Sequence, residues 1–211
     1  ETTTRLCNRR KSVNLYQNTP NTVLFLGDHI YQYHLKEKKF STITEEEGKD
    51  IVGTLVPFDH QENLTYINDI KHIYELDDQT SRLKTVFECY TDTVISSVSH
   101  DEQGHFWIGS NFGLIHYDPV LKSRTLVPTN LFTEINMVLC DQKGKVWIGV
   151  DNMLFAYFIK EQKFVLFGES NGAIQNEYLP NARLVNEQGD AYIGGVKGML
   201  RIDGQLLLNT S

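Results

Sequence analysis

The sequence repeats one pattern, whose clearest copies are GHFWIGSNFGLIHYD at residues 104–118 and GKVWIGVDNMLFAYF at residues 144–158. A third copy is GDAYIGGVKGMLRID at 189–203, and two divergent copies, NTVLFLGDHIYQYHL and NLTYINDIKHIYELD, begin at residues 21 and 63. Aligned on one aromatic residue, the copies are separated by 41, 41, 40 and 45 residues; the aromatic residues are Phe25, Tyr66, Trp107, Trp147 and Tyr192. A nearly constant period of this length indicates one supersecondary unit repeated along the chain.

Each period holds four short apolar segments separated by turn residues. The first segment precedes the aromatic residue, as in VISSVSH and INMVLC, the second contains it, and the fourth is represented by SRTLVP and KFVLFGE. These segments are rich in Val, Ile, Phe and Tyr, which favour strands, and no long window has helical periodicity. Four strands in a period of about 40 residues are typical of a β-propeller blade. We therefore predict an all-β protein, a β-propeller built of about five four-stranded antiparallel blades.

The repeats divide the chain, taken as a single propeller region over residues 1–211, into blades at approximately 11–50, 51–92, 93–132, 133–177 and 178–211. TTTRLC, within residues 1–10, is expected to be the outer strand of a preceding blade, and GQLLLN at 204–209 the fourth strand of the last blade.

Within a repeat, Asp101-Glu102-Gln103-Gly104 is expected to form a hairpin turn, in which the Asp side chain caps the turn and Gly adopts a positive φ. The following Phe-Trp-Ile segment is apolar at every position, as expected for a strand whose blade packs between two neighbours. The pattern that the repeats share is therefore interpreted as structural.

Composition excludes several functions. The formal net charge of −7 argues against a nucleic-acid partner, and no apolar run is long enough to span a membrane. Cys7, Cys89 and Cys140 form no metal-type cluster, and the seven histidines show no metal-binding spacing. No nucleophile elbow or suitably separated carboxylate pair is evident. We expect no catalytic residues, no metal site and no cofactor.

DEQGHFWIGSNFGLIHYD at residues 101–118 closely resembles the two-component-regulator propeller repeat, I-x-x-I-x-x-D-x-x-G-x-x-W-I-G-T-x-x-G-L-x-x-Y-D. The match is strong over 95–118 and 135–157, moderate over 181–203 and weak in the first two periods, which lack Trp-Ile-Gly. This family forms the extracytoplasmic sensor region of hybrid two-component system histidine kinases, as in Bacteroidetes. Its propellers usually have seven blades, whereas this chain has room for five. The resemblance therefore implies a segment of a larger, seven-bladed propeller array, and a closed five-bladed ring is the alternative.

The resemblance implies a non-catalytic sensing propeller in the periplasm that responds to an oligosaccharide or other small ligand and relays the signal to a histidine kinase. It also implies adjacent propeller and Ig-like domains in the same sensor, and a homodimer of the full sensor. Two alternatives stay open: a propeller enzyme similar to streptogramin lyase, and a purely structural or dimerisation propeller.

In a propeller, the connections from the second to the third strand and from the fourth strand to the next blade share one face, where ligands generally bind. Sugar recognition requires amides or carboxylates for the hydroxyl groups and aromatic rings for the sugar face. The candidate ligand-binding residues on this face are Asn111, Phe112, Asp151, Asn152, Asn176, Tyr178 and Arg183.

Overall fold

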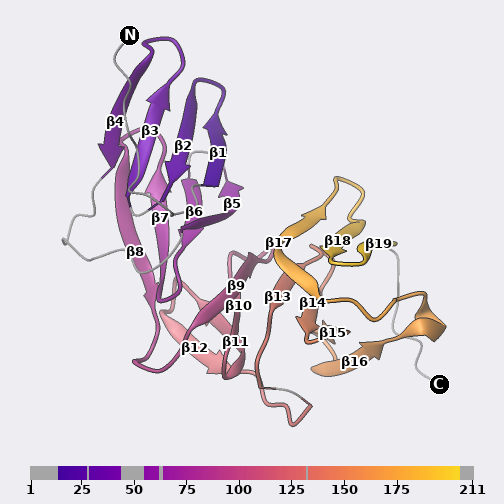
Figure 1. Cartoon of the computed structure of the whole chain (residues 1–211). Coiled ribbons are helices and arrows are strands. Elements are labelled where there is room, and N and C mark those ends of the chain that lie inside the picture. The colour runs from indigo at the N-terminus through magenta and orange to yellow at the C-terminus, as the bar shows by residue number, and fades with distance from the viewer. Residues whose placement is uncertain (1–13, 28, 44–54, 62–63, 132, 205–211) are drawn as a thin grey trace. The chain divides into compact units, whose positions relative to one another are not determined.

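The computed structural model describes residues 14–27, 29–43, 55–61, 64–131 and 133–204, almost all of them in short strands and turns (Figure 1). Contacts divide the chain into two compact units, residues 1–92 and 93–211, and each unit is described by itself.

The first unit contains two four-stranded sheets, coloured indigo to magenta in Figure 1. One consists of β1 (Asn14–Thr19), β2 (Thr22–Leu26), β3 (Ile30–His34) and β4 (Lys39–Ile43). The other consists of β5 (Val56–Gln61), β6 (Leu64–Asn68), β7 (His72–Asp77) and β8 (Arg82–Glu88). Neighbouring strands are antiparallel and follow chain order. The two sheets share one apolar core, which joins Leu24 and Ile30 of the first to Ile67 and Tyr74 of the second.

The second unit contains three further sheets, with strands again in chain order. The first is formed by β9 (Ile95–His100), β10 (Phe106–Ser110), β11 (Gly113–Asp118) and β12 (Ser123–Leu126). The next is formed by β13 (Met137–Cys140), β14 (Lys145–Val150), β15 (Met153–Phe158) and β16 (Lys163–Phe167). After the short 3-10 helix η1 (Glu169–Asn171), the last comprises β17 (Tyr178–Val185), β18 (Ala191–Gly195) and β19 (Gly198–Ile202).

These sheets confirm the predicted all-β propeller fold, with one antiparallel blade in each repeat. All five aromatic marker residues lie on the second strand of their blade, namely β2, β6, β10, β14 and β18. The last blade has three strands within the described residues. The expected strands TTTRLC and GQLLLN fall, apart from Gly204, outside the described residues.

Strand β14 shows why the second strand of a blade is apolar on both faces. Val146 and Ile148 belong to a core shared with Trp107 and Leu114 of the preceding blade. Trp147, which points to the opposite face, belongs to a core shared with blade β17–β19. Every residue of β14 is buried. Alternation therefore divides one strand between two inter-blade cores.

The Asp-x-x-Gly turns have the expected geometry. Asp101 Oδ1 accepts hydrogen bonds from the backbone N–H groups of Gln103 and His105, at 2.9 and 3.0 Å, and Gly104 has a φ of +85°. Asp141 caps the equivalent turn in the next blade in the same way. A side-chain oxygen thus replaces a backbone acceptor, and glycine adopts the left-handed conformation at low cost.

Candidate functional site

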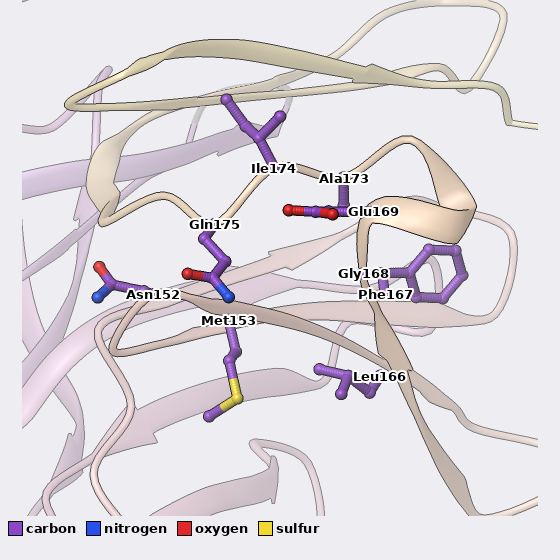
Figure 2. A pocket seen from close by; sticks show the side chains of 9 residues that line it. All are labelled: Asn152, Met153, Leu166, Phe167, Gly168, Glu169, Ala173, Ile174 and Gln175. Carbon is purple, nitrogen blue, oxygen red and sulfur yellow. The ribbon is translucent and has the colours of Figure 1, made fainter.

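A cavity of about 150 Å³ lies in the second unit, on the face where the sequence predicts ligand binding (Figure 2). It is formed where the β14–β15 turn meets the connection from β16 to β17. The backbone N–H of Asn176, in the connection, donates a hydrogen bond to the carbonyl of Asn152, in the turn, at 3.1 Å. The lining residues are Asn152, Met153, Leu166, Phe167, Gly168, Glu169, Ala173, Ile174 and Gln175.

The cavity combines polar groups with an apolar wall. Figure 2 shows the amides of Asn152 and Gln175 toward one end, with the Glu169 carboxylate on the connecting loop. Met153 and Leu166 supply apolar surface, and both side chains are partly open to solvent. Amides can exchange hydrogen bonds with hydroxyl groups, while the apolar surface suits the C–H face of a sugar ring.

Buried contacts hold the loop that lines this cavity. Asn176 is only 1% exposed; its Oδ1 accepts a hydrogen bond from the Lys197 N–H at 2.9 Å, and its Nδ2 donates to the Gly198 carbonyl at 3.2 Å. The Tyr178 hydroxyl donates to the Ile174 carbonyl at 2.9 Å, and burial raises the pKa of this phenol. Both side chains therefore have protein partners and act on the cavity by positioning its loop.

Arg183 lies away from the cavity lining. Its guanidinium donates a hydrogen bond to the carbonyl of Val98 on β9, which links the first strands of two blades. Burial lowers the pKa of Arg183 to about 10, so the side chain stays positively charged at neutral pH. Among the described residues, its buried Nη1 has no hydrogen-bond partner.

The remaining predicted residues are divided between two turns. Asn152 lines the cavity, whereas its neighbour Asp151 is exposed with a φ of +48° and is not among the lining residues. Asn111 and Phe112 lie on the equivalent β10–β11 turn and also do not line it. Asn111 Oδ1 accepts a hydrogen bond from the Val94 N–H at 2.8 Å, and the Phe112 ring is 53% exposed.

Sequence reasoning missed Gln175, Glu169 and the apolar wall as lining residues. The available signal was the interval of 45 residues, which marks an extended connection before the last blade. The lining includes one carboxylate, from Glu169. Glycoside hydrolysis generally uses two carboxyl groups flanking the scissile bond, of which this lining supplies one.

No family model and no curated protein matches the sequence. Among solved structures, the chain is similar to the extracellular domain of a one-component system from B. thetaiotaomicron (TM-score 0.68, 18% identity), covering 95% of this chain and 27% of that one. It is also similar to the extracellular domain of a hybrid two-component system from the same organism (TM-score 0.68, 15% identity), covering 97% and 29%. The chain thus spans less than one third of either structure.

Other proteins share the architecture to a similar degree. YCF48 from Cyanidioschyzon merolae matches with a TM-score of 0.67 and 10% identity over 92% of this chain and 70% of that one. Because such identities establish the fold alone, the comparisons assign a β-propeller architecture. Among the described residues, no helix is long and apolar enough to cross a membrane. The two B. thetaiotaomicron structures are extracellular domains of a one-component and a hybrid two-component system, and the sequence repeat resembles the repeat of hybrid two-component systems.

Proposed function

We propose that this chain is a ligand-sensing part of a periplasmic sensor region, that its ligand is an oligosaccharide, and that binding is relayed to a histidine kinase. The observation that carries the proposal is the cavity at the β14–β15 turn, where amides and an apolar wall meet. It lies on the loop face, by which we mean the face that carries the connections from second to third strands and from one blade to the next. The similarity to extracellular domains of sensor systems supports the same conclusion.

The size of the cavity defines how such a ligand would bind. Ligand pockets usually enclose about 300–1,000 Å³, whereas this one encloses about 150 Å³. One sugar unit of an oligosaccharide would occupy the cavity, and the rest would extend over its rim. Leu166 and Ile174, which are about half exposed, offer apolar surface there. The arrangement favours recognition of one terminal or branching sugar.

A glycan library titrated against the chain tests this proposal. We expect Asn152→Ala and Gln175→Ala each to weaken binding of the selected glycan about tenfold, the effect of losing a hydrogen bond of roughly 1.4 kcal/mol. Tyr178→Phe removes the bond to the Ile174 carbonyl and should weaken binding less. Gln103→Ala, an exposed change on an Asp-x-x-Gly turn, is the matched control.

Four outcomes would contradict the proposal. If no glycan binds, or if Asn152→Ala and Gln175→Ala bind as tightly as Gln103→Ala, this cavity is not the ligand site. Conversion of the bound ligand to a product would favour the lyase-like alternative. Self-association without ligand binding, measured by light scattering, would favour the structural or dimerisation alternative.

A further inference from the structure

Three potential metal ligands come together at the first blade of the second unit, outside the cavity. Asp101 lies at the β9–β10 turn, His105 at the end of that turn and His116 on β11. One potential ligand atom from each residue lies within 4.8 Å of the other two. Their sequence separations match no familiar metal motif, which is why the sequence predicts no metal site here.

The hairpin register brings the two imidazoles together. His116 pairs with Trp107 across β10 and β11, and the two rings lie 4.5 Å apart between centroids. His105 directly precedes β10, so its ring reaches the same side of the hairpin. His116 Nε2 and His105 Nδ1 are 3.0 Å apart. At this distance the two nitrogens share a hydrogen bond, so an ion that both of them bind would replace the proton between them.

The two following blades place different groups at the equivalent positions. Lys145 takes the place of His105 and forms an ion pair with Asp141, at 3.0 Å. In the last blade, Asp190 occupies that place and forms an ion pair with Arg201, which pairs with Tyr192 as His116 pairs with Trp107. In both blades a carboxylate forms an ion pair with a lysine or arginine side chain. The first blade instead sets a carboxylate beside two imidazoles.

We propose that Asp101, His105 and His116 bind a zinc-type divalent transition-metal ion, with the fourth position open to water. Tetrahedral Zn²⁺ with Zn–N distances of 2.0–2.1 Å requires ligand nitrogens about 3.3 Å apart. The present separation is 3.0 Å, so the imidazoles need to separate by only about 0.3 Å. The His105 side chain is 24% exposed, which gives an ion a path from solvent.

The surroundings supply the outer contacts that metal sites require. The unused nitrogen of a metal-bound histidine usually donates to a carboxylate. His105 Nε2 lies 3.5 Å from Asp118 Oδ2, and Asp118 Oδ1 is fixed by the backbone N–H groups of Val120 and Leu121. Asp101 Oδ1 accepts two backbone N–H groups, and Oδ2 accepts the indole N–H of Trp107 at 2.8 Å. These bonds hold the carboxylate and leave one lone pair, on Oδ2, for an ion.

Calorimetric titration of the chelator-treated, tag-free chain with ZnCl₂ tests the proposal. We expect one saturable equivalent for the wild type and loss of saturable binding in the double variant His105→Gln/His116→Gln. Asp118→Asn should weaken affinity about 10–100-fold, as expected for a partner outside the metal ligands. The matched control is His29→Gln/His34→Gln, which removes two imidazoles from the other unit.

A second measurement requires no variant. In the wild type, Zn²⁺ should shift the imidazole NMR signals of His105 and His116 and leave those of His29 and His34 in place. The proposal is overturned if the His105 and His116 signals do not move at one equivalent of Zn²⁺. It is equally overturned if the folded His105→Gln/His116→Gln variant binds Zn²⁺ as tightly as the wild type, or if His29→Gln/His34→Gln abolishes binding.

Discussion

The two tryptophans occupy equivalent positions but differ in one hydrogen bond, so replacing each by phenylalanine should give unequal losses of stability. The Trp107 indole N–H donates to Asp101 Oδ2 at 2.8 Å. The Trp147 Nε1 atom is buried and has no hydrogen-bond partner among the described residues. Both side chains are almost fully buried. The packing lost on changing Trp to Phe is therefore similar at the two sites, whereas the polar contribution has opposite signs.

The magnitudes follow from these contacts. Loss of packing should cost about 1–2 kcal/mol at each site. At Trp107 the change also removes a hydrogen bond to a charged acceptor, which contributes about 1.5–3 kcal/mol. At Trp147 it removes a buried donor without a partner, which offsets the packing loss by about 1–3 kcal/mol. We expect Trp107→Phe to be more destabilising than Trp147→Phe by at least ~2 kcal/mol.

Urea unfolding followed by far-UV circular dichroism, in the presence of EDTA, measures this difference without depending on tryptophan fluorescence. Similar m-values would show that the same surface is exposed on unfolding. Trp147→Ala, by contrast, should cost about 3–5 kcal/mol, since it empties an inter-blade core. The reasoning is refuted if the two Phe variants differ by less than about 0.5 kcal/mol, or if Trp147→Ala costs less than about 1 kcal/mol.

Three further measurements test other parts of the structure. Gly109→Ala should destabilise the chain by about 1–3 kcal/mol in thermal unfolding. The new Cβ would lie 2.7 Å from a methyl group of Ile135 and 2.8 Å from one of Val138, at the start of the next blade. An unchanged melting temperature would contradict this close packing. Burial raises the pKa of the Cys140 thiol, so peptide-resolved alkylation should modify it only after unfolding, and rapid native labelling would be inconsistent with that burial. Hydrogen bonds from the Gly204 N–H and the Arg201 guanidinium lower the pKa of Asp190 from 3.8. Its contribution to stability is therefore present above pH 3.8 and lost as the pH falls through the lower native pKa; Asp190→Asn should flatten this part of the stability–pH curve, and an unaltered curve would count against the interaction.

The blades could be predicted from the sequence because each is specified by local rules. Turn residues, alternating apolar positions and a fixed period act within about 40 residues, so the aromatic residues Phe25, Tyr66 and Trp107 correctly locate second strands. The opposing faces of β14 follow from the same pattern, since a strand apolar at every position needs two buried faces.

For the candidate site, the sequence could predict the face of the propeller but not the residues that line the cavity. The long connection before the last blade was visible in the repeat interval, but residue type did not reveal where each side chain points. Asn176 has a side-chain amide of the kind that binds sugar hydroxyl groups, yet its Oδ1 already accepts a hydrogen bond from the Lys197 N–H. His105 and His116 are eleven residues apart, and only the register of the β10–β11 hairpin brings them together. Both results depend on contacts between elements.

The cavity occurs where one blade departs from the repeat. Gly113 and Gly198 begin the third strand in the blades on either side, with φ values of +115° and +131°. In the middle blade Met153 takes this place, and the positive φ moves to Asp151. Met153 then lines the cavity (Figure 2). A position that the two flanking blades fill with glycine thus carries a side chain in this blade, where a ligand could contact it.

Restoring the repeat residue therefore separates folding from binding. Met153 is partly exposed, so Met153→Gly should change stability by no more than about 1 kcal/mol, mainly through backbone entropy. The same change removes a wall of the cavity and should weaken glycan binding by about tenfold or more, the effect of losing roughly 1.5 kcal/mol of apolar contact. Met153→Leu retains apolar volume and should bind nearly as the wild type does. Equal affinities for the Gly and Leu variants would mean that Met153 is a neutral departure from the repeat, and that the ligand-binding surface lies elsewhere on the loop face.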